Sequence, residues 1–358
     1  MTMHPITKIF CCSILAFGLV GCGGGGGGPL VQDYFVETPP PDTTTLESLM
    51  VASSPTKSKD FYLLPDSDDY DNIPQDPLNP LTGAKVEVGK LIYHDPAFAT
   101  EGIALRAKTW SCASCHHARA GFKSGMIQGI GEGGEGFGLK GETRGWFDPE
   151  IGTQDADVQP VTSPTILNVA FQDVMLWNGQ LGNASNGIIN VGIDPEILMT
   201  EGTPKVANAE GLSGIETQAI AGTGVHRILG FPPELEDSDY YQMLLDAFPE
   251  YSRDELHKSS TRAIAAFERT VLANQSPFQL WLRGNTDAMS EREIAGAEVF
   301  FGDGGCVACH QGAAFSSPIG ATADQVFFAV GFADLDFNEI IGGISDPVRL
   351  GRGGFTQV

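Results

Sequence analysis

The sequence predicts a mainly α-helical fold with long loops, in which two copies of one short cysteine motif stand far apart. The motif is Cys-x-x-Cys-His, which occurs as CASCH ending at His116 and as CVACH ending at His310. Apolar side chains recur at helical spacing in several segments. By contrast, residues 121–220 are rich in glycine and proline and have few periodic stretches, so we expect loops there.

The helices are predicted from apolar residues that return every third or fourth position. Residues 85–96 (KVEVGKLIYHDP) place Val88, Leu91 and Ile92 on one face, and the closing proline ends the segment. Residues 239–249 and 260–273 show the same spacing. The serine and glutamate of SERE at 290–293 form a capping box, which predicts a helix leading to the second cysteine motif.

The N-terminus predicts export from the cytoplasm. Residues 1–21 carry one lysine and then an apolar stretch too short to span a bilayer, as a lipoprotein signal peptide does. They end on Leu-Val-Gly before Cys22, which resembles the bacterial lipoprotein box and predicts a lipid anchor on that cysteine. Gly23 follows, and in the usual sorting pattern this favours the outer membrane, facing the periplasm. Residues 22–60, which begin with a glycine run, are predicted to be a flexible linker.

The cysteines predict two covalently bound haem c groups. Beyond Cys22, the only cysteines are Cys112, Cys115, Cys306 and Cys309, so both motifs are complete and no thiol is left over. In Cys-x-x-Cys-His each thiol bonds to one vinyl group of the porphyrin, and the histidine that follows binds the iron. His116 and His310 are therefore the predicted iron ligands. Zinc could bind the same cysteine pairs, but a histidine after each pair in an exported chain favours haem.

The charge composition limits which kinds of binding partner are expected. The formal net charge is −24, with 45 acidic and 21 basic residues, which argues against a nucleic-acid-binding protein. An acidic surface suits solubility or a basic protein partner.

Several strings carry a resemblance to a known family. VGKLIYHDPAFA precedes the first motif, SPTILNVAFQDVMLWNG and GIETQAIAG follow it, and AIAAFERTVLANQSPFQLWLRGN leads to the second. Over residues 81–358 the chain resembles the bacterial di-haem cytochrome c peroxidases and the related di-haem enzymes that oxidise tryptophans of a partner protein. The resemblance implies two cytochrome c-like haem domains, an N-terminal peroxidatic one at 61–273 and a C-terminal electron-transfer one at 274–358.

The resemblance also implies a function. The second haem would take electrons from a small donor protein such as a cytochrome c, and the first would reduce hydrogen peroxide to water. Trp177 matches the family's tryptophan between the haems, which relays electrons. Gln218 matches the glutamine of the pocket above the first haem. A non-catalytic di-haem electron-transfer protein, or a di-haem oxidase of another substrate, is the alternative.

Four departures from the family pattern matter. The family's acid–base glutamate has no counterpart except His226, which either moves protons or only packs at the end of a helix. Where many members have a histidine that closes the resting first haem, this chain has Glu132, so the far side of that iron is expected to be open or to hold water. Thr162 replaces an asparagine of the family's calcium loop, which argues against calcium. The chain ends at Val358, where the family continues into a ligand loop, so the C-terminal domain is expected to be truncated.

Overall fold

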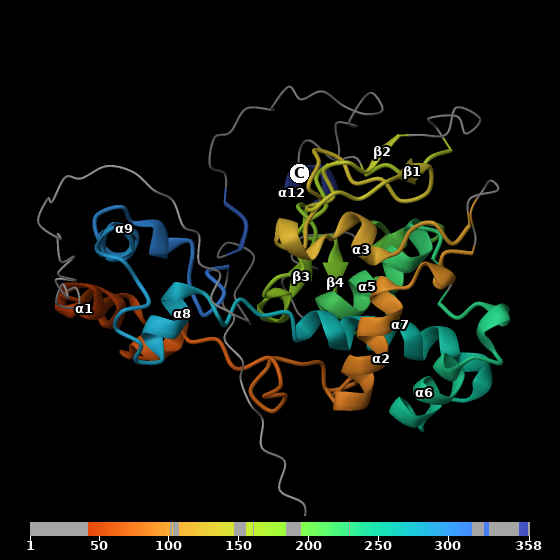
Figure 1. Ribbon diagram of the computed structural model, residues 1–358, viewed down its shortest axis with the longest axis horizontal. Helices are drawn as coiled ribbons and strands as arrows, with labels where there is room; N and C mark the ends of the chain where they lie inside the picture. Colours follow the sequence, from red (N-terminus) through yellow and green to blue (C-terminus); the bar gives the residue numbers. More distant parts are fainter. Residues whose placement is uncertain are drawn as a thin grey trace, which may run out of the picture. The chain divides into compact units, whose positions relative to one another are not determined.

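The computed structural model describes residues 42–100, 102, 107–146, 155–159, 161–183, 195–228, 230–316, 326–328 and 351–356. The predicted signal peptide and Cys22 lie outside these residues. The described chain is mostly helical, and its strands form two small antiparallel pairs, so the mainly α prediction is confirmed (Figure 1).

The longer helices alternate with short 3₁₀ turns. The α-helices are α1 (Thr44–Ser53), α2 (Gly83–His94), α3 (Cys112–Cys115), α4 (Pro195–Leu198), α5 (Gly214–Val225), α6 (Asp239–Ala247), α7 (Leu256–Arg269), α8 (Pro277–Leu282), α9 (Glu291–Phe301) and α12 (Arg352–Thr356). The strands are β1 (Gly134–Glu135), β2 (Gly145–Trp146), β3 (Val174–Met175) and β4 (Leu181–Gly182). Strand β1 pairs with β2, and β3 pairs with β4.

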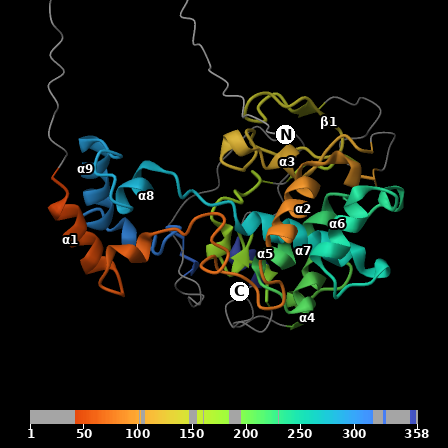
Figure 2. The ribbon, with the colours of Figure 1, turned by 60° about the horizontal axis from the view of Figure 1, so that its bottom comes forward.

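The largest hydrophobic core lies among α2, α5, α6 and α7. Helix α7 contacts both α2 and α5, and the three lie together in both views (Figures 1 and 2). Val88 and Ile92 of α2 are buried there, as are Ala263, Ile264 and Phe267 of α7, which confirms these apolar positions. The prediction is wrong for Leu91, whose side chain is 43% exposed. Helix α2 ends at His94, and the proline that was predicted to end it begins a short 3₁₀ helix.

A separate core forms around the second cysteine motif. Helices α1, α8 and α9 supply it, and α1 contacts α9 (Figure 2). The capping box predicted for α9 is present: Ser290 N–H donates to Glu293 Oε2 at 2.8 Å, and Glu293 N–H donates to Ser290 Oγ at 3.3 Å. Met289, which precedes this helix, is buried in the core.

The linker predicted over residues 22–60 is wrong for its C-terminal part. Residues 44–53 form α1, and Leu46 and Met50, one helical turn apart, are fully buried against the core of the second motif. Tyr62 is buried in the same core, so the domain boundary predicted at residue 61 divides one packed unit. The surrounding segment is rich in Ser, Thr and Pro, which hid the apolar side chains that pack this helix against the core.

Loops dominate the described parts of residues 121–220, as predicted, but the expectation fails at α5. That helix contains three glycines, and such residues lower intrinsic helix propensity. Its burial against α7 compensates, since Ile215, Ala219 and Ala221 belong to the largest core. In the part of the chain that is described, no helix combines the length and hydrophobicity needed to cross a bilayer.

Candidate haem site

The first cysteine motif forms one wall of a cavity. Helix α3 begins after Ser111, whose side chain and that of Ser114 form a capping box, and this short helix carries both thiols. Cys112, Cys115 and His116 all line the cavity, whose space of about 1050 Å³ is partly open to solvent. Burial raises the pKa of both thiols to about 12, so without a bound group they are neutral side chains on an apolar wall.

The remaining walls are largely apolar. They come from the loop before β3, from β3 itself and from α5 and α7. The apolar lining residues are Trp110, Pro164, Ile166, Val169, Met175, Leu176, Ile215, Ala219, Ile228 and Ile264. Two neighbouring thiols, a histidine and an apolar enclosure are what a covalently attached haem requires, so the residues fit the predicted cofactor.

The imidazole of His116 is oriented by the backbone. Its Nδ1 lies 3.2 Å from the carbonyl oxygen of Phe122, and a carbonyl only accepts hydrogen bonds. The proton therefore sits on Nδ1, and Nε2 is left free to bind a metal. Burial lowers the pKa of His116 to about 4, which keeps the ring neutral, as metal binding needs. His117 is not among the residues that line the cavity.

The second motif repeats this arrangement. His310 Nδ1 lies 3.0 Å from the carbonyl oxygen of Phe315. Phe122 and Phe315 both adopt left-handed backbone conformations, with φ of 56° and 51°. After each histidine, the next residue forms an isolated antiparallel bridge, His117 with Lys123 and Gln311 with Ser316. Strained φ values at matching places in two distant motifs indicate a shared device that orients the iron ligand.

Sequence reasoning missed these phenylalanines. The available signal was a phenylalanine soon after each motif, in CHHARAGF and CHQGAAF. The second motif also differs from the first, because Cys306, Cys309 and His310 are exposed and do not line the cavity of the first motif.

Helix α5 presents two of the predicted residues to the cavity. Gln218 and His226 both line it, and they are two helical turns apart with Gly222 between them. A Cβ atom on Gly222 would lie 3.4 Å from Gln218 Nε2 and 4.0 Å from His226 Cδ2, so the glycine leaves open space between these side chains. The Oε1 atom of Gln218 is buried and has no hydrogen-bond partner, which leaves an acceptor for a small ligand.

His226 is held at several points at the C-terminal end of α5. Its Nδ1 lies 2.9 Å from Asp157 Oδ2 and 3.2 Å from Gln159 Nε2. Trp110 Nε1 donates to its backbone carbonyl at 2.8 Å. Asp157, Gln159 and Trp110 also line the cavity. An imidazole bonded through Nδ1 can use only its Nε2 for chemistry in the cavity.

Glu132 lies beside this cluster and not in the cavity. Its carboxylate is fully buried and pairs with the guanidinium of Arg227, which also donates to the carbonyl of Asp155 at 2.6 Å. The carboxylate at position 132 is therefore engaged in fixing the chain next to His226.

Trp177 lies outside the cavity. Its side chain is 69% exposed, whereas Met175 and Leu176 just before it line the cavity wall. Its Nε1 lies close to the backbone of Gly351.

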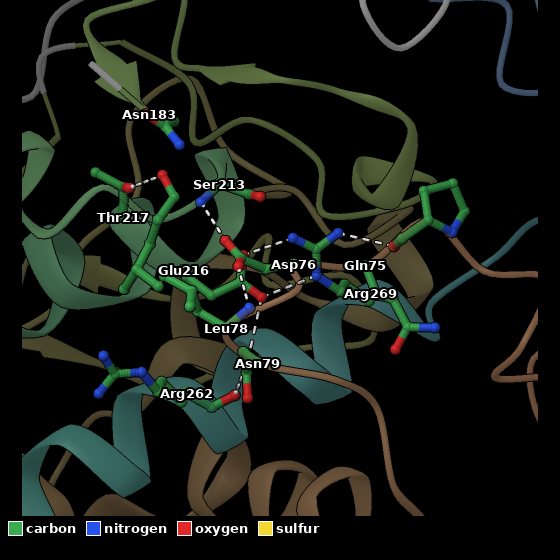
Figure 3. A network of polar contacts seen from close by, with 12 residues as sticks. Gln75, Asp76, Leu78, Asn79, Asn183, Ser213, Glu216, Thr217, Arg262 and Arg269 are labelled. Carbon is green, nitrogen blue, oxygen red and sulfur yellow. Dashed lines mark hydrogen bonds and ion pairs between the residues drawn. The ribbon is translucent and has the colours of Figure 1, made fainter. Parts of the chain in front are cut away.

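A buried polar network connects two walls of the cavity (Figure 3). Arg269 of α7 donates to both carboxylate oxygens of Glu216 on α5, and Asn79 Nδ2 donates to Glu216 Oε1 at 3.2 Å. Asp76 Oδ2 accepts from the backbone N–H of Ser213, just before α5. Because Glu216 and Arg269 lie next to cavity-lining stretches of their helices, the network fixes the spacing of those walls.

Glu268 is a further cavity residue that sequence reasoning missed. Burial, and then the charge of Glu216, raise the pKa of its carboxyl to about 8. The side chain lines the cavity as part of the α7 face that also carries Ile264. The signal available in the sequence was a glutamate next to the apolar face of a predicted helix.

The hydroxyl of Thr162 is engaged with the backbone. Thr162 Oγ1 donates to the carbonyl of Ile127 at 2.7 Å, so this hydroxyl already has a backbone partner. Among the residues that the structure describes, no three His, Cys, Asp or Glu side chains group as ligands for a metal ion.

Comparison with known proteins identifies relatives of this chain. The family model for di-haem cytochrome c peroxidase matches residues 83–287. Cytochrome c peroxidase Ccp of Escherichia coli is 26% identical over 260 residues, which is 72% of this chain and 44% of the relative. Cytochrome c551 peroxidase of Pseudomonas aeruginosa is 25% identical over 65% of this chain and 52% of its own length.

A third relative carries a different name. Methylamine utilization protein MauG of Methylorubrum extorquens is 23% identical over 67% of this chain and 53% of its own length. The chain thus spans about half the length of the curated relatives it matches.

Proposed function

Because the chain belongs to the di-haem cytochrome c peroxidase family, we propose that it reduces hydrogen peroxide to two waters with electrons from a small donor protein such as a cytochrome c. The observation that carries this proposal is one cavity that holds Cys112, Cys115 and His116 together with Gln218 and His226. The first three would hold the haem, and the other two would act on peroxide.

The haem iron, when bound, supplies the redox chemistry. The protein's own contribution begins with binding: the buried Oε1 of Gln218 accepts a hydrogen bond from a peroxide O–H in the space left by Gly222. His226 Nε2 takes a proton from one peroxide oxygen and returns it to the other, so that the O–O bond breaks with water as leaving group. The reduction consumes two electrons and two protons in all.

The remaining roles follow the family resemblance. Cys306, Cys309 and His310 would hold the second haem, which receives electrons from the donor. Trp177, exposed and next to the cavity wall, would relay electrons toward the first haem.

Replacing His226 tests the assignment. In His226→Ala we expect peroxide turnover to fall at least about tenfold, because loss of a general acid–base group typically costs 10²–10⁴ in rate. Haem content and the spectrum of the second haem stay unchanged. The matched control is His94→Ala, since His94 is exposed and its Nδ1 bonds only to the backbone carbonyl of Lys90.

Two outcomes would contradict the assignment. Equal rates in His226→Ala and the parent protein would make His226 a packing residue. Conversion of a low-spin first haem to a high-spin one in the variant would make His226 an axial iron ligand, as expected of a non-catalytic electron-transfer protein.

We propose that the protein lies on the periplasmic side of a bacterial membrane, to which a lipid on Cys22 anchors it. The support is the sequence Leu-Val-Gly-Cys after an apolar segment and before a glycine run. Cys22→Ser should move the protein from the membrane fraction to the soluble periplasmic fraction. A parent protein that already fractionates as soluble would rule out the anchor.

A further inference from the structure

Asp157 is a buried carboxylate placed against the imidazole of His226. Only 7% of its surface is exposed, and Oδ2 lies 2.9 Å from His226 Nδ1. These residues are far apart in the sequence, and no role for Asp157 follows from the cysteine motifs or from the peroxide-binding face of α5.

The contacts of Asp157 fix which ring nitrogen carries the proton. An ionised carboxylate only accepts hydrogen bonds, so the 2.9 Å contact requires a proton on His226 Nδ1. Gln159 Nε2 is 3.2 Å from the same Nδ1 but also 3.2 Å from Asp157 Oδ1, to which it can donate instead. The opposite tautomer would set the lone pair of Nδ1 against the carboxylate, which is unfavourable.

The segment that carries Asp157 is hydrogen-bonded through its backbone to residues 130–132. The N–H of Gly131 donates to the carbonyl of Asp157 at 2.7 Å, and the N–H of Asp157 donates to the carbonyl of Glu132 at 3.1 Å. Ile130 and Val158 form an antiparallel bridge. Rigid backbone on both sides is what precise placement of a functional group requires.

Gly131 leaves space for the carboxylate of Asp157, and Arg144 supports the neighbouring backbone. A Cβ atom on Gly131 would lie 2.1 Å from Asp157 Oδ2, so only glycine at 131 admits the carboxylate in this position. The buried guanidinium of Arg144 donates to the carbonyls of Ile130 at 2.6 Å and Gly131 at 2.8 Å. Arg144 thereby holds the stretch against which Asp157 rests, and its charge is attracted to that of Asp157.

We propose that Asp157 is a positioning residue, which accepts the Nδ1 proton of His226 and so presents the unprotonated Nε2 to the cavity. The inference rests on the proposed function, because it assumes that His226 moves the proton. His226 Nε2 takes a proton from a ligand that arrives protonated, and then returns this proton to the ligand or releases it to solvent. The Nδ1 proton stays between His226 and Asp157. The developing imidazolium is stabilised by the carboxylate.

The test uses a ligand whose binding needs a base. Hydrogen cyanide binds ferric haem as the anion, so its association with the haem-loaded protein requires a residue that takes the proton. Carbon monoxide binds ferrous haem and carries no proton. In Asp157→Asn we expect cyanide association at the first haem to slow at least about tenfold, as for loss of acid–base function. Carbon monoxide association, haem content and the resting spectrum stay unchanged.

A second variant shows whether Asp157 acts through His226. In a His226→Ala background, Asp157→Asn should cause no further slowing of cyanide association or of peroxide turnover. The matched control is Asp95→Asn, because Asp95 also accepts from a side chain, Tyr240 at 2.7 Å, but does not line the cavity. Asp157→Ser replaces Asp157→Asn if the latter fails to load haem.

The outcomes separate this inference from the proposed function. Normal cyanide association in Asp157→Asn, with slow turnover in His226→Ala, overturns the role of Asp157 and leaves the peroxidase assignment standing. Normal peroxide turnover in His226→Ala overturns the assignment itself. Additive losses in the double variant, or haem loss in both Asp157 variants, would assign Asp157 to the fold and overturn the inference.

Discussion

Arg269 and Glu216 form a buried two-point ion pair between α7 and α5, with Arg269 Nε 2.9 Å from Glu216 Oε1 and Nη2 2.5 Å from Oε2. Neither residue is more than 3% exposed. Arg269 also donates to the carbonyl of Pro74 at 2.8 Å, so one guanidinium joins two helices and the loop before α2. The cavity walls are thus held by charges that have no access to water.

The first prediction concerns this pair. Glu216→Ala leaves the guanidinium of Arg269 buried without its partner, and breaking a buried pair in this way costs about 3–5 kcal/mol of the free energy of unfolding. Chemical denaturation of the haem-loaded protein measures it. The control is Arg253→Ala, whose exposed pair with Glu236 should contribute about 0–1 kcal/mol. Similar losses of the free energy of unfolding in both variants would show that the buried pair contributes no more to stability than the exposed pair.

The second prediction concerns haem attachment. Denatured protein should keep its colour, and alkaline pyridine spectra should give two c-type haems per chain, because both motifs offer two thiols and a histidine. Replacing Cys112 and Cys115 together by alanine should remove one haem and leave the other. Zinc in place of haem, or no change of haem content in that double variant, would contradict covalent attachment at the first motif.

The third prediction concerns pH. Burial raises the pKa of Glu268 from an ordinary 4.5 to about 8, so the folded chain keeps a proton that the unfolded chain releases. The free energy of unfolding should therefore fall as the pH rises from about 4.5 to about 8, and then stop changing on account of this group.

Glu268→Gln, which stays neutral, should lose this part of the pH dependence. Denaturant midpoints measured at the two ends of that pH range should show that the stability of the variant increases relative to that of the parent protein as the pH rises. Glu87→Gln, at an exposed position of α2, should run parallel to the parent. A parallel curve for Glu268→Gln as well would mean that the carboxyl is ionised in the fold.

The fourth prediction concerns Trp177. Because its side chain is 69% exposed, Trp177→Phe should change the free energy of unfolding by less than about 0.5 kcal/mol. Turnover with an electron donor should fall, while the direct reaction of the reduced first haem with peroxide keeps its rate. Unchanged turnover would exclude Trp177 from the electron path.

The sequence predicted those features that depend on nearby residues. The apolar faces of α2, α6 and α7 and the capping box at Ser290 follow from spacings of three and four residues, and the structure has them, except that Leu91 on the predicted face of α2 is exposed. Helix α1 was missed because its short apolar face, Leu46 and Met50 with the partly buried Leu49, lies in a segment otherwise rich in Ser, Thr and Pro. Its burial depends on α9, which lies far along the chain.

The residues of the cavity also divide into those that the sequence predicted and those that depend on distant contacts. His116 was predicted from a motif, and Gln218 and His226 from the family resemblance. The structure brings all three to one cavity. Asp157 could not be predicted, because its contact with His226 depends on the path of a loop that no periodic pattern marks. The carbonyl groups of Phe122 and Phe315 were also missed, because a phenylalanine after each motif does not by itself show which backbone carbonyl accepts from the histidine.

The most direct test of a peroxidase with two haems is stopped-flow absorption spectroscopy of the fully reduced, haem-loaded protein. Reduction of one hydrogen peroxide takes two electrons, and two haem irons supply one each. We therefore expect one equivalent of peroxide to reoxidise both haems, and half an equivalent to reoxidise half of the total. A spectrum of the first haem that stays unchanged on mixing with peroxide would contradict the proposed function.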